Sequence, residues 1–178
     1  MTRLRIPVGP GDHADGPSDA PFTLVEYGDY QCPYSARAQL ELVRLRQVLG
    51  RRMRLVYRHF PLTHLHPHAL VAAEAAEAAA AQGRFWEMHD LLLENQHALD
   101  AQALVSYAAA LDLDGARFEA DLEAHRFLQR IRRDVAGGAR SGVQGTPTFF
   151  VNGARHEGAA TVDAFLDALE GASPAYGF

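Results

Sequence analysis

The sequence contains one cysteine, Cys32, in 178 residues, and this scarcity excludes an internal disulfide. Proteins of oxidising compartments commonly carry paired cysteines, so the count gives no sign of such a compartment. The segment from Met1 to Asp19 also lacks the continuous apolar stretch of a secretory signal. We therefore expect a cytoplasmic protein, with a periplasmic or secreted protein trimmed of its leader as the alternative.

Long apolar runs and an excess of positive charge are missing as well. No apolar run approaches the roughly 18 residues that a membrane-spanning helix needs. The formal net charge is −5 and the sequence pI is about 6.0. This balance argues against binding a nucleic acid by phosphate neutralisation and provides no polybasic membrane anchor. We expect no nucleic acid and no membrane among the partners.

The residues that are present fit one folded domain. Hydrophobic residues make up 48% of the chain and charged residues 22%, which allows a sizeable core. The 15 glycines and 9 prolines are too few for a long disordered or fibrous segment. We predict a single domain over residues 1–178.

The N-terminal part predicts a strand–helix–strand unit. Residues 22–27 (FTLVEY) are typical of a buried strand, and Cys32-Pro33 favours a helix start, with Gly50 as its end. Residues 53–60 predict a second strand, which the helical crossover places parallel to the first. Ahead of this unit, residues 4–6 look strand-like and residues 7–21 predict an extended lead-in.

The stretch of about 61–145 changes to helical periodicity. We predict five helices in it, with Asp100 and Asp114 as the N-caps of two of them. The apolar residues Phe85, Trp86 and Met88 are expected to belong to the core.

Strand signals return after this helical stretch. Residues 148–151 followed by Asn152-Gly153 predict a hairpin, with a return strand over residues 155–157 and a closing helix over residues 161–169. The predicted class is therefore α/β, with βαβ and ββα units separated by a helical insertion.

Cys32 is the candidate reactive group, because it stands at the first turn of a predicted helix. Unpaired backbone N–H groups and the helix dipole favour a thiolate there, and the thiolate is the nucleophile. Ser35, three residues on, is the candidate hydrogen-bond donor to the sulfur. The alternative is that Cys32 is a small buried hydrophobic residue.

Glu26 and Pro147 are the other candidate site residues. Strand alternation turns Glu26 toward the core, where burial would raise the pKa of its carboxyl and allow it to relay a proton; a solvent-facing glutamate at a sheet edge is the alternative. Pro147 enters a buried strand, and a cis bond there would leave the backbone of Thr146 open to an extended peptide. An ordinary turn proline is the alternative.

Four histidines lie close together in the sequence, at positions 59, 64, 66 and 68. Their spacing matches no common structural zinc pattern, and Cys32 lies in a different segment. We expect no metal site.

Several segments together resemble one family. Residues 22–35 (FTLVEYGDYQCPYS), residues 58–62 with His66-Pro67, residues 83–89 (GRFWEMH) and residues 142–153 (GVQGTPTFFVNG) are similar in kind and order to the DsbA-like thioredoxin-fold thiol–disulfide oxidoreductases. The resemblance covers residues 20–169.

This resemblance implies a thioredoxin fold with an inserted helical subdomain, and it implies roles for single residues. Cys32 falls on the nucleophile, Glu26 on the buried acid near it, and Pro147 on the cis-proline that faces the sulfur. Thr146 falls on a residue that touches substrate, and Pro33 and Tyr34 on the motif beside the nucleophile, where substrate also binds.

Ser35 departs from the family, whose motif is usually C-P-x-C. A serine hydroxyl cannot release a mixed disulfide as a second cysteine does. Either Ser35 is an introduced substitution, or the protein is naturally monothiol and a small thiol completes the cycle.

The expected function is therefore mixed-disulfide formation at Cys32 with protein or low-molecular-weight thiol substrates. No bound cofactor is expected, and glutathione or a similar thiol is the candidate co-substrate. A redox-inactive thioredoxin-like peptide-binding module and a kappa-type glutathione transferase are the alternatives; a cysteine in place of serine at the helix start counts against the transferase.

Overall fold

The computed structural model describes residues 2–172 and contains the predicted strand–helix–strand unit. Strand β2 (Phe22–Gly28) leads into helix α1 (Pro33–Leu49), a 3-10 turn η1 (Gly50–Arg52) follows, and strand β3 (Met53–His59) returns. Pro33 begins α1 and Gly50 is its C-cap with a positive φ of 51°. Strands β2 and β3 pair in parallel, as the crossover predicts.

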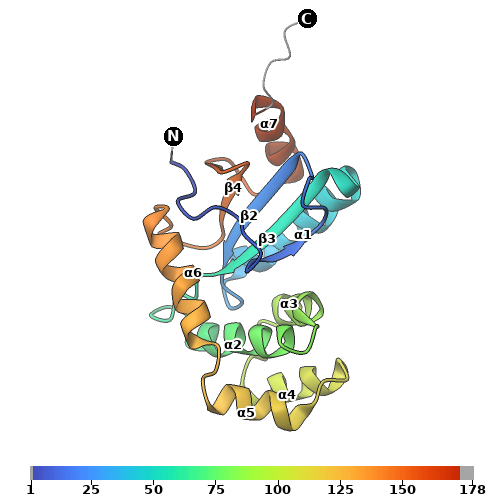
Figure 1. Cartoon of the computed structure of the whole chain (residues 1–178), viewed down its shortest axis with the longest axis vertical. Helices are drawn as coiled ribbons and strands as arrows, with labels where there is room; N and C mark the ends of the chain where they lie inside the picture. The colour runs from blue at the N-terminus through green and yellow to red at the C-terminus, as the bar shows by residue number, and fades with distance from the viewer. Residues whose placement is uncertain (1, 173–178) are drawn as a thin grey trace, which may run out of the picture.

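The sheet has five strands in the order β1-β3-β2-β4-β5 (Figure 1). Strand β4 (Thr148–Val151) turns into β5 (Ala154–Arg155) through Asn152 and Gly153, which both have positive φ angles, as a two-residue hairpin turn requires. The predicted return strand is present, but its bounds of 155–157 were wrong, because pairing begins at Ala154, directly after the turn, and ends at Arg155.

Strand β1 (His13–Asp15) pairs antiparallel with β3 and lies within the segment that we expected to be only extended. Residues 4–6, which look strand-like, form no strand; Arg3 alone makes an isolated bridge to Ala154. Residues 13–15 become a strand because they lie along an edge of β3 that no other strand occupies. The position of a pairing partner, rather than the local sequence, therefore decides which part of this segment becomes a strand.

The insertion contains the five predicted helices: α2 (Ala69–Ala80), α3 (Phe85–Glu94), α4 (Ala101–Ala110), α5 (Gly115–Glu123) and α6 (Leu128–Arg140). The side chains of Asp100 and Asp114 accept hydrogen bonds from the backbone at the starts of α4 and α5, as expected of N-caps. Helix α7 (Val162–Ala172) closes the chain that the structure describes.

The core forms three clusters. One lies between the sheet and helices α1 and α7, and a second lies on the opposite sheet face under α6 and the N-terminal segment. The third is the interior of α2–α5, the group of helices that lies below the sheet in Figure 1. Phe85 and Met88 belong to this third cluster, and Trp86 packs against it, as predicted.

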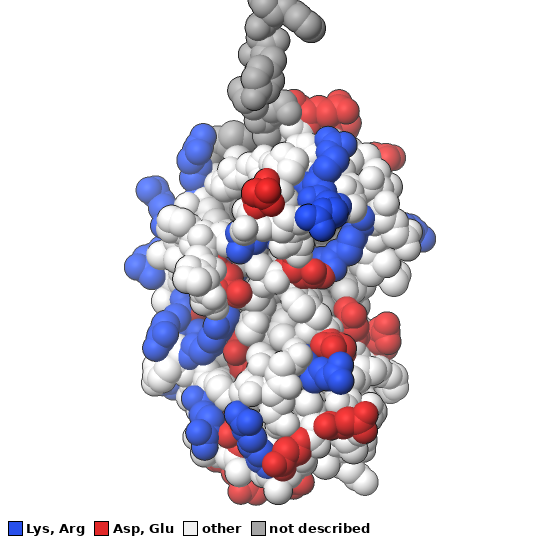
Figure 2. All heavy atoms as spheres, turned by 45° about the vertical axis from the view of Figure 1, so that its right-hand side comes forward, with Lys and Arg blue, Asp and Glu red and all other residues white. Residues whose placement is uncertain are grey.

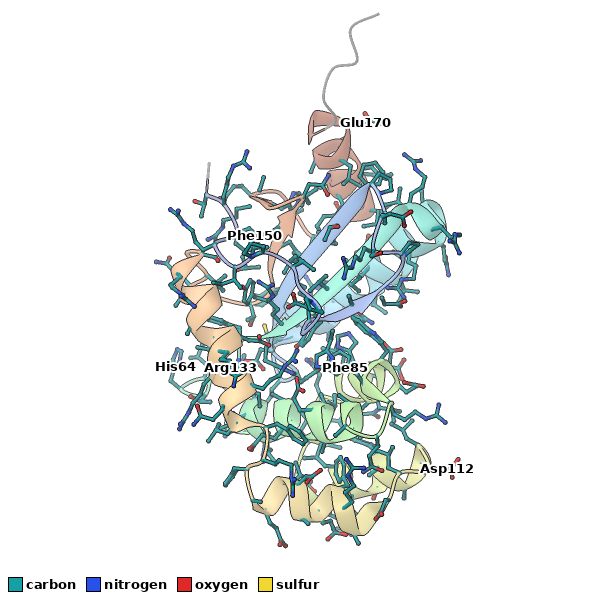
Figure 3. All side chains as sticks on the ribbon, viewed as in Figure 1. His64, Phe85, Asp112, Arg133, Phe150 and Glu170 are labelled. Carbon is teal, nitrogen blue, oxygen red and sulfur yellow. The ribbon has the colours of Figure 1, made fainter. Side chains whose placement is uncertain are left out.

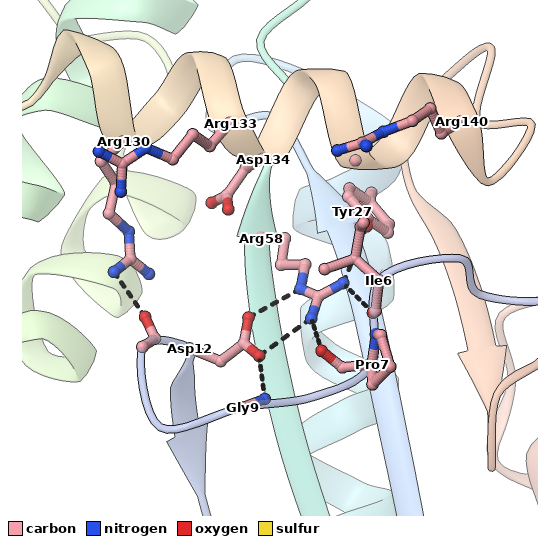
Figure 4. Close-up of a pocket in the computed structure, with 12 residues that line it drawn as sticks. Ile6, Pro7, Gly9, Asp12, Tyr27, Arg58, Arg130, Arg133, Asp134 and Arg140 are labelled. Atoms are coloured by element: carbon pink, nitrogen blue, oxygen red, sulfur yellow. Dashed lines mark hydrogen bonds and ion pairs between the residues drawn. The ribbon is translucent and has the colours of Figure 1, made fainter.

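The N-terminal segment is tied to the sheet by Arg58. Its guanidinium donates to both carboxylate oxygens of Asp12, at 2.7 and 2.9 Å, and to the carbonyl oxygens of Ile6 and Pro7 (Figure 4). Burial lowers the pKa of Arg58, but its hydrogen bonds outweigh that effect, so the net shift is upward. This buried charge is therefore fully partnered by the chain itself.

Candidate active site

Cys32 lies directly after the β2–α1 loop, as the N-cap residue of α1. The side chain is only 3% exposed, and its Sγ donates a hydrogen bond of 3.2 Å to the carbonyl oxygen of Thr146. The Thr146–Pro147 peptide bond is cis. The structure thus brings together Cys32 and the Thr146-Pro147 loop, which are 114 residues apart in the sequence.

Ser35 is fully buried behind Cys32, but it does not take the expected role of a donor to the sulfur. Its Oγ accepts a long hydrogen bond of 3.4 Å from the backbone N–H of Asp29, and no hydrogen bond joins this Oγ to the Sγ of Cys32 within residues 2–172. The backbone N–H of Ser35 donates to the Cys32 carbonyl oxygen at 3.0 Å. Tyr34, in contrast, is 64% exposed, and Pro33 is exposed beside it.

Glu26 lies in β2, at the centre of the sheet, and is 1% exposed. Its neighbours across the sheet are Tyr57 in β3 and Phe149 in β4. Neither carboxyl oxygen has a hydrogen-bond partner among the described residues. Burial without a partner raises the pKa of Glu26 to about 8, so the carboxyl holds its proton at neutral pH.

Sequence reasoning missed two residues that hold the loop before Cys32. Asp29 is buried, and its carboxylate accepts from the backbone N–H groups of Gln31 and Leu62 and contacts Nδ1 of His66 at 2.8 Å. Gln96 donates from Nε2 to the carbonyl oxygens of Tyr30 and Cys32, both at 2.8 Å. The helical insertion therefore fixes the loop from one side.

An open groove of about 560 Å³ runs beside the Thr146-Pro147 loop. Tyr34 and Arg37 of α1 line it, opposite Pro147, Phe149 and His156. On the face shown in Figure 2, acidic and basic side chains are interspersed rather than separated by sign. The groove is large enough for an extended peptide segment, whose backbone would lie along the loop.

Of the four clustered histidines, only His66 places its side chain in this site among the described residues, through Asp29, while His68 donates its backbone N–H to the Gln31 side chain. His64 and His68 are exposed, and His59 is buried at the end of β3. The sequence pattern therefore does not mark one common site.

Chemically, the site combines a single sulfur at a helix N-terminus with a buried acid in the adjoining strand. Cys32 stands at the N-terminal end of α1, which is the positive end of the helix dipole. Glu26, protonated at neutral pH, lies in the strand that leads to the loop. No described helix has the length and apolar character needed to cross a membrane.

A family model and two solved structures all relate this chain to thioredoxin-fold proteins. A family model described as Thioredoxin matches residues 9–171. The structure aligns with a thioredoxin-like oxidoreductase from Silicibacter pomeroyi DSS-3 at a TM-score of 0.82, with 30% identity, over 92% of this chain and 93% of that chain. BdbD from Bacillus subtilis aligns at a TM-score of 0.80 with 22% identity, over 90% of this chain and 92% of that chain, and this likeness concerns the fold alone.

Among curated proteins, the chain is 51% identical over 95% of its length to a Na(+)/H(+) antiporter NhaA 1 from Salinispora arenicola, and 48% identical over 93% of its length to an NhaA from Herminiimonas arsenicoxydans. It spans only 26% and 27% of those two proteins, so their name describes much longer chains. The predicted thioredoxin fold and the DsbA-like resemblance are confirmed. The chain belongs to the thioredoxin family.

Proposed function

We propose that the protein is a thiol–disulfide oxidoreductase that acts through Cys32 alone. The observation that carries the proposal is the position of Cys32: it is the N-cap residue of α1, and its Sγ lies 3.2 Å from the Thr146 carbonyl oxygen of the opposite loop. The family and the Silicibacter pomeroyi relative, itself named an oxidoreductase, support the same class. Substrates are disulfides of proteins or of low-molecular-weight thiols.

The proposed first step is attack of the Cys32 thiolate on one sulfur of a substrate disulfide. A bond forms between Cys32 and that sulfur, the substrate S–S bond breaks, and the other sulfur leaves as a thiolate. Glu26, with its pKa raised to about 8 by burial, supplies a proton to the leaving thiolate, directly or through water. Tyr34 and the Thr146-Pro147 loop hold the substrate in the groove between them.

The second step needs an external thiol, because Ser35 cannot attack the mixed disulfide. When the first attack transfers a glutathione-class thiol onto Cys32, a second such thiolate attacks the sulfur of the bound thiol. This forms the symmetrical small disulfide and returns Cys32 as thiolate. We place this cycle in the cytoplasm, where such reducing thiols are abundant. No bound cofactor takes part.

The test compares this chain with Ser35→Cys and Cys32→Ser. The pH dependence of alkylation of Cys32, insulin reduction and glutathione-dependent disulfide turnover are measured for each protein. We expect faster alkylation than a free cysteine at neutral pH and glutathione-dependent turnover in this chain, both absent in Cys32→Ser. Turnover that appears only in Ser35→Cys would identify a dithiol enzyme that has lost its second sulfur.

A sulfur that is inert in both Cys32-containing forms would contradict the proposal. The exposed groove beside Pro147 would then favour the peptide-binding module, with partner binding unchanged in Cys32→Ala. Transfer of glutathione to a model electrophile in this chain would instead favour the kappa-type transferase.

A further inference from the structure

Three polar side chains from separate elements meet where the sheet adjoins the helical insertion. His13 comes from β1, His59 from the end of β3 and Glu77 from α2. The Nε2 atoms of His13 and His59 lie 2.7 and 2.8 Å from the same carboxylate oxygen, Oε1 of Glu77. One ligand atom from each residue thus falls within 4.8 Å of the other two.

These side chains are held in place by their surroundings. His59 and Glu77 are buried, and His13 is partly buried. The His13 ring stacks on Phe85, with ring centroids 3.5 Å apart and an angle of 8° between the planes. Phe85 begins α3 and lies on the side of the insertion next to the sheet (Figure 3), so β1 and the insertion together orient the His13 ring. Rings that are already oriented lose little side-chain entropy when they bind a ligand.

The charge around the cluster suits a cation. Burial raises the pKa of Glu77, but the hydrogen bonds from His13 and His59 outweigh burial and lower it, so the side chain is a carboxylate. Nε of Arg130 lies 3.2 Å from Oε1 of Glu77, and a carboxylate oxygen of Asp134 accepts from the His59 backbone N–H. The cluster therefore sets two acidic side chains, Glu77 and Asp134, against the one guanidinium of Arg130. Arg130 and Asp134 lie next to each other on α6 in Figure 4.

We propose that His13, His59 and Glu77 bind a divalent transition-metal ion, with zinc as the best match. Two imidazole nitrogens and one carboxylate oxygen form a donor set that zinc accepts, and three protein ligands leave one coordination position for water. To bind a metal through Nε2, each imidazole must give up its Nε2–H contact with Glu77 and hold its proton on Nδ1.

Binding requires a small local movement. Ligand atoms placed about 2.0–2.1 Å from a tetrahedral zinc ion are about 3.3 Å apart, which is wider than the present contacts. Strand β1 has only three residues and lies at the edge of the sheet, so His13 is the ligand that moves outward most easily. The metal then joins the N-terminal segment to β3 and α2.

This site differs from the one that the clustered histidines suggest in the sequence. Only His59 of that group takes part, while His66 contacts Asp29 and His64 is exposed. We expected no metal site because those four histidines have the wrong spacing. The other two ligands, His13 and Glu77, come from parts of the chain that spacing alone could not associate with His59.

The experiment uses the full chain carrying Cys32→Ala, which removes the thiolate as a competing ligand. Co²⁺ is titrated into the chelator-treated protein and followed by its visible absorption, and Zn²⁺ is then added as a competitor. We expect one ion per chain, displaced by zinc. His13→Gln should weaken binding at least tenfold, whereas the matched control His64→Gln, an exposed histidine, should leave it unchanged.

Thermal unfolding provides a second measurement that does not depend on the cobalt spectrum. A ligand that binds only the folded state raises the Tm, so Zn²⁺ should raise the Tm of the parent but not that of His13→Gln or His59→Gln. The Tm of each metal-free variant shows that it is folded. Absence of binding in the parent, or equal affinity and equal Tm shifts in parent and variants, would overturn the proposal and leave an internal hydrogen-bond cluster.

Discussion

Glu26 and Glu77 are both buried glutamates, yet the structure gives them opposite charge states. Glu26 has no hydrogen-bond partner among the described residues, and burial raises its pKa to about 8. Glu77 is contacted by His13, His59 and Arg130, and its pKa is lowered. Glu26 therefore keeps its proton at neutral pH, while Glu77, at the junction of the sheet and the insertion, loses it.

The comparison shows that burial alone does not set the charge of a carboxyl. Burial disfavours the charged form of both residues, and only the neighbours of Glu77 compensate for it. An unpartnered acid reduces stability at neutral pH but keeps a proton available for chemistry. A partnered acid stabilises the fold and has no proton to give. Four measurements test this contrast.

The largest expected effect comes from Glu77→Gln. The substitution removes the negative charge and leaves Arg130 without its anion, and breaking a buried charge pair costs roughly 3–5 kcal/mol. Urea unfolding at pH 7 measures the loss. Glu87→Gln is the control, because Glu87 pairs with Arg84 on the surface and should change stability by less than about 1 kcal/mol. Equal losses in the two variants would contradict the contrast.

Glu26→Gln should have the opposite sign. The folded-state pKa of about 8 exceeds the ordinary 4.5, so the benefit of holding the proton is complete below pH 4.5 and is lost as the pH rises toward 8. The neutral amide avoids that loss, so the variant should gain roughly 3 kcal/mol relative to the parent at pH 7 and almost nothing at pH 4. Unfolding at several pH values checks this, and a pH-independent difference would exclude a raised pKa.

Lowering the pH below 5 should reduce the contribution of Glu77 to the free energy of unfolding and should leave that of Glu26 unchanged. The pKa of Glu77 is lowered, so its contribution is present above the unfolded value of 4.5 and is lost as the pH falls through the lower folded value. The stability difference between parent and Glu77→Gln should therefore shrink by about 2 kcal/mol between pH 5 and pH 3. Unfolding of both proteins across this range measures it, and a constant difference would contradict the lowered pKa.

The smallest expected effect is that of Asp100→Ala, which serves as a reference within the same insertion. The carboxylate caps α4 by accepting from the Ala103 backbone N–H at 3.0 Å, in an exposed position. Loss of such a cap costs about 1 kcal/mol. If urea unfolding gives a loss as large as that of Glu77→Gln, burial is not the source of the larger effect.

Much of the fold was predictable because local signals agree with it. Pro33 and Gly50 mark the ends of α1, Asn152-Gly153 marks the hairpin, and β2 reads as a buried strand. Strand β1 was not predictable, because residues 13–15 have no strand pattern and form one by pairing with β3. Edge pairing of this kind depends on a partner strand 40–44 residues away in the sequence.

The candidate site likewise contains residues that could be predicted from the local sequence and residues that could not. Cys32 and Glu26 could be predicted from their place in local elements, since a helix start and an apolar strand are visible in the sequence. The contacts of Gln96 and Asp29 with the loop could not, because they join segments 33–66 residues apart. Glu77 gave no signal either: it is one of two glutamates in an alanine-rich helix, and nothing in the local sequence associates it with His13 or His59.

The short outer strands have a consequence for behaviour at high concentration. The sheet is bounded by β1 with three residues and β5 with two, so each rim offers few free backbone donors and acceptors to another chain. Long, flat rims promote edge-to-edge association, and native proteins avoid it by keeping such strands short. The short outer strands β1 and β5 thus disfavour the pairing of two molecules into an extended sheet.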